Sequence, residues 1–194
     1  DFKLGFRNPV EIEHTPPTRA IPKRNVDLPK TKELGCKFRD WYQCDTDYWT
    51  DKYGLTEQQL LYYNVRPVHS VFLGADVITT GSVKDPIYAY IFYKDGKYTY
   101  KIYRPLTDDK KHKWMSSTNR TVLQGWDQLP PSGDLLILTK AQKDVMVYRT
   151  FGYHAIACQN EVSIVKDTVM DELKSRFKHI VVNQDNDEAG ILGT

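Results

Sequence analysis

The sequence is poor in the features that mark a disulfide-stapled, zinc-binding or membrane-spanning protein. Its 194 residues include three cysteines, Cys36, Cys44 and Cys158, without the paired Cys-x₂-Cys knuckles of a zinc site. The odd count argues against a disulfide framework, so we expect a reducing, cytoplasmic setting. No run reaches the ~18–20 apolar residues of a membrane span, and the start of the chain shows no charged-then-apolar leader. We therefore expect no membrane partner.

Charge of neither sign dominates the whole chain, but one segment is strongly basic. The formal net charge is +2, whereas residues 94–120 hold eight lysines and arginines against three aspartates. Such a segment is either a solvated loop that keeps the protein soluble or a surface that neutralises phosphates. We favour the phosphate interpretation, because the basic run precedes a group of acidic residues described below.

The first part of the chain divides into an arm and a mixed subdomain. Residues 1–35 are rich in proline, lysine and arginine, which is typical of an extended arm or linker. Residues 40–63 have a helical pattern, in which Thr56 and Gln59 fit a capping box. We expect a small α+β subdomain over residues 36–133.

A β-hairpin is the clearest element of this subdomain. Residues 88–93 and 97–103 are two runs rich in tyrosine and β-branched residues, and Asp95-Gly96 between them is a strong tight-turn signal. The tyrosines could stack nucleic-acid bases. Cross-strand packing explains them as well and is the interpretation that we favour.

The last third of the chain has a strand–helix–strand–helix–strand pattern. Apolar runs over residues 135–139, 154–157 and 179–182 predict buried strands, and amphipathic spacing over 140–151 and 168–177 predicts helices. This order predicts a parallel sheet with crossover helices over residues 134–194. The fold class is therefore α+β followed by α/β.

Three acidic residues are expected near the carboxyl ends of these strands, where open α/β sheets bind ligands. Asp144 follows the first strand, and Asp185 and Asp187 follow the third. Two carboxylates at i and i+2 can share one hard cation, and Mg²⁺ takes one or two protein carboxylates together with phosphate oxygens. The plain alternative is an Asx-rich turn that only ends the strand.

These residues resemble the Toprim domain of bacterial-type DNA primases, especially phage versions. Asp144 matches the Asp of the family's strand-Glu-Gly-x-x-Asp motif, and Asp185, Asp187 and Gly190 match its strand-Asp-x-Asp-x-x-Gly motif. The resemblance spans roughly residues 40–194. A Toprim sheet continues beyond these motifs, so the resemblance implies that the domain is incomplete at residue 194.

The resemblance extends upstream and carries further roles with it. The segment Lys113-Trp114-Met115-Ser116-Ser117 is similar to a Lys-aromatic-x-Asn-Ser segment of primases, and Arg104 is similar to a basic residue of their polymerase core. By this resemblance Asp185 and Asp187 would hold Mg²⁺ or Mn²⁺, while Arg104 and Lys113 would hold nucleotide or template phosphates. The implied partners are a single-stranded DNA template, ribonucleoside triphosphates and a replicative helicase, in a bacterium or a phage-infected host.

The chain departs from the family at one important position. Lys140 stands where the first motif has Glu, and a lysine cannot bind Mg²⁺. Lys140 and Lys143 could instead neutralise phosphates, and Glu161 could supply a replacement carboxylate.

Other classes of protein share parts of this pattern. One alternative is a primase-derived module that binds single-stranded DNA or a replication partner without catalysis. Topoisomerases and some nucleases also use a Toprim sheet, but a topoisomerase needs a nucleophilic Tyr in a separate domain. A haloacid-type phosphatase carries its Asp-x-Asp on the first strand of the domain, whereas here the pair follows the third.

Overall fold

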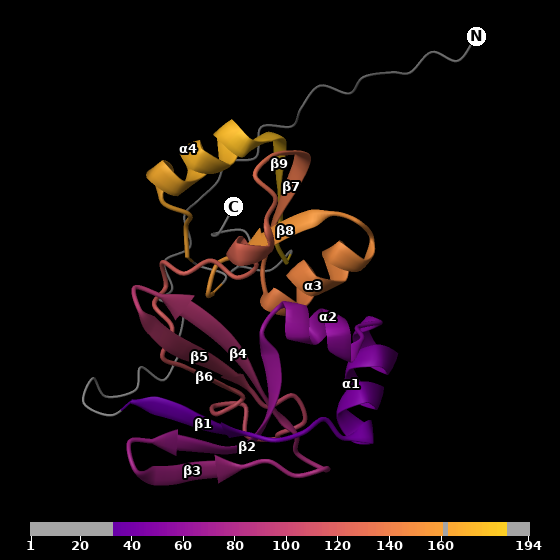
Figure 1. Ribbon diagram of the computed structural model, residues 1–194, viewed down its shortest axis with the longest axis vertical. Coiled ribbons are helices and arrows are strands. Elements are labelled where there is room, and N and C mark those ends of the chain that lie inside the picture. Colours follow the sequence, from indigo (N-terminus) through magenta and orange to yellow (C-terminus); the bar gives the residue numbers. More distant parts are fainter. Residues whose placement is uncertain (1–32, 161–162, 186–194) are drawn as a thin grey trace, which may run out of the picture.

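A computed structural model describes residues 33–160 and 163–185. The first half of this region is an antiparallel sheet with the order β1-β2-β4-β5-β6, to which β3 adds beside β2 (Figure 1). The strands are β1 (Leu34–Phe38), β2 (Val65–Leu73), β3 (Asp76–Thr80), β4 (Ile87–Lys94), β5 (Lys97–Tyr103) and β6 (Trp114–Ser116). β1 begins at Leu34, so the last two residues of the predicted arm belong to the sheet.

The predicted hairpin is confirmed as β4 and β5. Asp95 and Gly96 connect the strands with φ angles of 52° and 78°, which are the two positive values that a type I′ turn requires. The hairpin pairs Lys94 with Lys97 at its tip and Tyr88 with Tyr103 at its base. An aspartate followed by a glycine adopts this turn at little steric cost, so the local sequence sets the register.

The predicted helical stretch over residues 40–63 is two helices, α1 (Gln43–Tyr53) and α2 (Glu57–Tyr62). Gly54 ends α1 in the left-handed conformation, with φ 66° and ψ 24°. Thr56 then starts α2 with the expected capping box, in which its hydroxyl accepts from the Gln59 amide. Leu55 between the helices is fully buried and fixes the corner.

The second half is the predicted parallel sheet. Its elements are β7 (Gly133–Thr139), α3 (Gln142–Thr150), β8 (His154–Ala157), α4 (Asp167–Arg176) and β9 (Phe177–Asn183). β7 lies in the centre, and both β8 and β9 pair with it in parallel.

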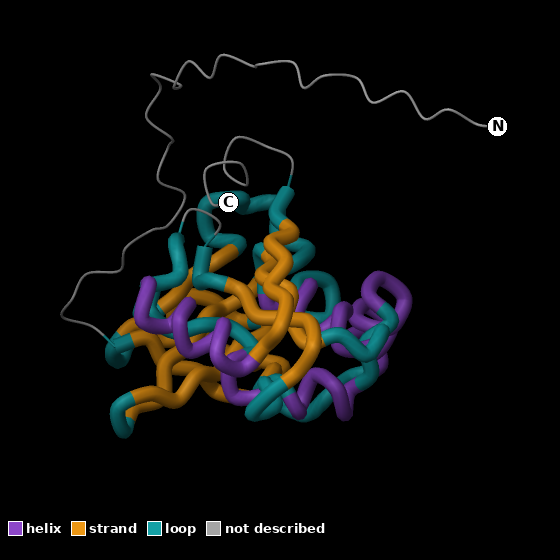
Figure 2. Tube along the Cα trace, turned by 90° about the horizontal axis from the view of Figure 1, so that it is seen from above, coloured by secondary structure: helices purple, strands orange, loops and turns teal. Residues whose placement is uncertain are grey.

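The two crossover helices cover opposite faces of this sheet. α3 connects the central strand β7 to β8 on one edge, and α4 connects β8 to β9 on the other edge. Because both crossovers are expected to be right-handed and run in opposite directions along the sheet, the helices lie on different faces. Val145 and Met146 of α3 pack with Ile137, whereas Leu173 of α4 packs with Leu136 and Leu138. Seen from above, strands run through the middle of the molecule with helices to either side (Figure 2).

The prediction of a buried third strand is wrong for most of its length. β9 lies at the edge of the described parallel sheet, and Val181 and Val182 are 48% and 39% exposed. The helix before it also ends one residue early, because Phe177 already has extended backbone and starts the strand. An apolar run cannot distinguish a central strand from an edge strand, because the difference depends on the partners.

One hydrophobic core joins the two sheets. It packs α1 and the inner face of β4 and β5 against α3 and β8, with Trp49, Tyr88 and Tyr90 among its largest fully buried side chains. Gly125, before the short helix η1 (Trp126–Gln128), lies close against Val145 with φ 81°. No helix in the described part of the chain is long and apolar enough to cross a membrane.

Candidate active site

The carboxyl edge of the parallel sheet brings Lys140 and Asp185 together. Lys140 directly follows β7, and Asp185 lies two residues beyond β9. Because β7 and β9 are parallel neighbours, their ends meet, and the Lys140 Nζ lies 2.5 Å from the Asp185 Oδ1. Both side chains are partly exposed, so ligands can reach this ion pair from solvent.

Asp144 lies beside this pair in the first turn of α3. Burial raises the pKa of its carboxyl group; Lys140 and Lys143 lower it, and Asp185 raises it further, leaving the pKa above its ordinary value. Its Oδ2 is buried and has no hydrogen-bond partner among the described residues. The surroundings of Asp144 thus disfavour the negative charge of its carboxylate.

Lys143, the residue before Asp144 on α3, places its ammonium group in a cage of tyrosines. Its ammonium group lies 5.1 Å from the ring centre of Tyr53 and 5.2 Å from that of Tyr103, and it donates to the Tyr53 hydroxyl at 3.3 Å. Tyr48 bridges the cage, with hydroxyl distances of 3.0 Å to Tyr103 and 3.4 Å to Tyr53. Burial acts to lower the pKa of Lys143, but the phenol oxygens of Tyr103 and Tyr53 outweigh it and hold the pKa above its ordinary value.

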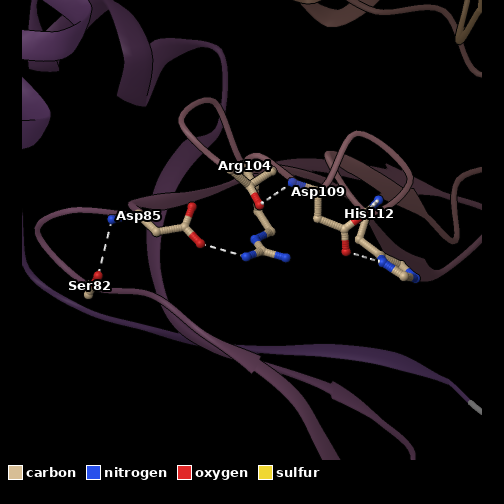
Figure 3. A network of polar contacts seen from close by, with 6 residues as sticks. Ser82, Asp85, Arg104, Asp109 and His112 are labelled. Carbon is tan, nitrogen blue, oxygen red and sulfur yellow. Dashed lines mark hydrogen bonds and ion pairs between the residues drawn. The ribbon is translucent and has the colours of Figure 1, made fainter.

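Arg104 and Lys113 form a second group on the antiparallel sheet. The Arg104 amide donates to the Lys113 carbonyl at 3.0 Å, so these residues extend the pairing of β5 and β6 by one step at its open end. The Arg104 guanidinium is 15% exposed and forms a 2.5 Å ion pair with Asp85 (Figure 3). The Tyr103 ring contacts residues of both groups: it stacks on Trp114, next to Lys113, with ring centres 4.2 Å apart, and it lies under the Lys143 ammonium group.

A polar junction between the two sheets is not predicted by any pattern in the sequence. The Lys101 Nζ donates to the Gln159 carbonyl at 2.7 Å and lies 5.2 Å from the Trp114 ring centre. Gln124 is fully buried, pairs its backbone with Ala157 at the end of β8, and donates its side-chain amide to the Cys158 carbonyl. Lys101 belongs to the basic run, but only the three-dimensional pairing shows that it joins the sheets.

Two predicted metal ligands, Asp187 and Glu161, lie outside the described residues. Among the described residues, no group of three or more His, Cys, Asp and Glu side chains could hold a metal ion. The negative charge of Asp185 nevertheless raises the pKa of Asp144, whose buried Oδ2 has no hydrogen-bond partner among the described residues. Oxygen donors with excess negative charge are what a hard divalent cation takes, so these two residues fit Mg²⁺.

Comparison with solved structures finds chains of similar fold, whereas comparison by sequence finds none. No family model matches the chain, and no curated protein matches it in sequence. A chain in the solved structure of bacteriophage T7 lagging-strand DNA polymerase interacting with primase domains of two gp4 subunits, bound to an RNA/DNA hybrid and dTTP, is similar at a TM-score of 0.45 and 11% identity. The match covers 77% of this chain and 65% of that one. A likeness of this size carries no argument about function.

Proposed function

We propose that this chain is the core of a DNA primase, which makes short RNA primers on single-stranded DNA by metal-dependent nucleotidyl transfer. The observation that carries the proposal is the convergence of Lys140, Asp144 and Asp185 at the carboxyl edge of the parallel sheet. The ordered motifs that resemble the Toprim domain of primases support it. The proposal includes a Toprim-type parallel sheet as the domain that carries this edge.

The chain's own residues would position phosphates at this edge. Lys140 has an ammonium group that can pass from Asp185 to a triphosphate oxygen, because the pair is partly exposed. The ammonium group of Lys143 is held by Tyr53 and Tyr103. Lys143 would therefore add positive charge near the start of α3 without binding a phosphate directly. Arg104, whose guanidinium pairs with Asp85, and Lys113 would hold nucleotide or template phosphates. Positioning and charge neutralisation of this kind supply most of the rate in phosphoryl transfer.

Asp144 and Asp185, together with Asp187 beyond the described residues, would hold the metal ion. When bound, Mg²⁺ or Mn²⁺ neutralises phosphate charge and activates the attacking hydroxyl. Asp144 would gain from this, because a divalent cation removes the penalty of its buried, unsatisfied oxygen. Glu161 remains a further proposed ligand.

Oligoribonucleotide synthesis on single-stranded DNA tests the proposal. The chain is incubated with template, ribonucleoside triphosphates and Mg²⁺ or Mn²⁺, and the products are separated by length. We expect template-dependent products that fall at least about 100-fold in Asp185→Ala and Asp144→Ala, in line with the loss of a main electrostatic contributor. Asp171→Ala, an exposed aspartate on α4, is the matched control and should retain full synthesis. Undiminished synthesis in both site variants would overturn the assignment.

A non-catalytic nucleic-acid-binding module is the second candidate. The specific observation in its favour is that Lys140 already occupies one Asp185 oxygen. The same experiment separates the two: a folded wild-type chain that binds single-stranded DNA but makes no product is the module.

A further inference from the structure

Five of the six tyrosines of the β4–β5 hairpin fall into two groups with different surroundings. Tyr88, Tyr90 and Tyr103 are at most 3% exposed and belong to the core between the sheets. Tyr93 and Tyr98, at the end of the hairpin, are 58% and 66% exposed. Core packing therefore explains the first group and leaves the second without a burial role.

Tyr93 and Tyr98 form an exposed aromatic pair. They lie directly opposite each other in the register of the hairpin, with ring centres 4.8 Å apart and planes inclined by 50°. Tyr100 follows Tyr98 on the same face of β5, and Phe38 of β1, 41% exposed, approaches Tyr100 at 6.3 Å. An aromatic surface thus extends from the hairpin end toward the edge of the sheet.

The turn beside this pair concentrates positive charge. Lys94 and Lys97 are cross-strand partners, and like charges directly opposite each other destabilise a hairpin. The side chains of Lys94 and Lys97 lie on the opposite face of the hairpin from Tyr93 and Tyr98. The Lys94 Nζ lies 3.4 Å from the Thr121 hydroxyl. A pair of like charges that destabilises the hairpin without a visible structural benefit is typical of a functional site.

We propose that the hairpin tip, residues 93–98, binds single-stranded DNA. Bases stack on Tyr93 and Tyr98, while the strand crosses the turn so that Lys94 and Lys97 contact its phosphates. Aromatic platforms beside positive charge are the general means of binding single strands, because every base has a flat face to stack. The proposal rests on the proposed function for the identity of the strand, which would be the template.

The tip also lies within reach of the candidate active site. Lys101, four residues from Lys97 and on the same face of β5, contacts Gln159 just past the end of β8. At the usual strand rise, four residues span about 13 Å. A template held at the tip can therefore continue toward the carboxyl edge of the parallel sheet.

The test is the affinity of the whole chain for fluorescein-labelled oligothymidylate, measured by anisotropy at low salt without nucleotides. We expect Tyr93→Leu/Tyr98→Leu to bind at least about fivefold more weakly, the smallest loss expected for one stacked base. Tyr93→Phe/Tyr98→Phe keeps the rings and should bind like wild type. Tyr62→Leu/Tyr153→Leu removes two tyrosines that are 54% and 47% exposed elsewhere, and should also bind like wild type.

The lysines have a separate readout. Lys94→Gln/Lys97→Gln should lower the slope of log affinity against log salt by about 1.4, because each phosphate that a lysine neutralises on a single strand contributes about 0.7 to that slope. An unchanged slope, unchanged binding by a folded leucine variant, or a wild-type chain that does not bind would overturn the proposal. Tyrosine-dependent binding without primer synthesis would refute only the proposed function. Primer synthesis with tyrosine-independent binding would refute only this inference.

Discussion

Asp45 and Asp144 show how neighbours decide the charge of an enclosed carboxyl group. Burial alone would raise the pKa of Asp45, but hydrogen bonds from Arg39, from the Tyr42 amide and from Tyr88 hold it below its ordinary value. Asp144 has weaker compensation, and burial keeps its pKa raised. Relative to a free aspartate, the fold therefore shifts the pKa of Asp45 down and that of Asp144 up.

The pH dependence of stability should expose Asp144. A raised pKa in the folded state contributes stability below the ordinary pKa of 3.8, and this contribution is lost as pH rises through the raised value. Asp144→Asn should therefore raise the melting temperature at pH 7 relative to wild type, with the gain vanishing toward pH 3. Circular dichroism melts between pH 3 and pH 8 check this. A variant that melts below wild type at pH 7 would show that the Lys140 and Lys143 contacts outweigh burial.

At the scale of elements, local signals are predictable and partners are not. The Asp95-Gly96 turn and the alternation of strands and helices after residue 133 follow from short-range chemistry, so the sequence predicts the hairpin and the parallel sheet. The exposed position of β9 and the bridge between Gln124 and Ala157 depend on residues far apart in the chain. For the same reason the sequence suggests that Asp144 and Asp185 share an edge, but not that Lys140 pairs with Asp185 or that Lys143 turns toward tyrosines.

Gly125 joins η1 to the α3 side of the sheet, and its replacement tests that contact. A Cβ at this position would lie 2.6 Å from the Val145 Cγ1 and 3.0 Å from the Ala155 carbonyl oxygen, whereas a Cβ at Gly152 would meet nothing within 4 Å. Both glycines have positive φ, so each alanine variant costs about 1–2 kcal/mol in backbone strain. Gly125→Ala should cost a further ~1–3 kcal/mol from overpacking. Urea denaturation of the two variants measures the difference, and equal losses would contradict the packing.

At the scale of the whole molecule, the two sheets share a core and should unfold together. Trp49 of α1 packs in the same cluster as Met146 of α3 and Ala157 of β8, and Lys101 and Lys143 add polar contacts across the junction. Removing a residue at this junction should therefore weaken both halves at once.

Lys143→Met tests this cooperativity. The change keeps an apolar stem but removes the cation between Tyr53 and Tyr103, and should lower the free energy of unfolding by about 1–2 kcal/mol. Urea transitions followed by tryptophan fluorescence and by far-ultraviolet circular dichroism should shift together and stay coincident. Lys174→Met on α4, an exposed lysine, is the control and should change stability by less than about 0.5 kcal/mol. Two separate transitions would show that the halves unfold independently.

The Lys140–Asp185 ion pair has a consequence for the order of ligand binding under the proposed function. A divalent cation competes with the Lys140 ammonium group for the negative charge of the Asp185 carboxylate, so the ion pair weakens the binding of a cation alone. A triphosphate offers that ammonium group a new anion and reduces the cost of the exchange. Cation and triphosphate then strengthen each other's binding, and thermodynamic reciprocity requires the two enhancements to be equal. The lysine that replaces an expected acid would thus make the metal and the nucleotide arrive as a cooperative pair.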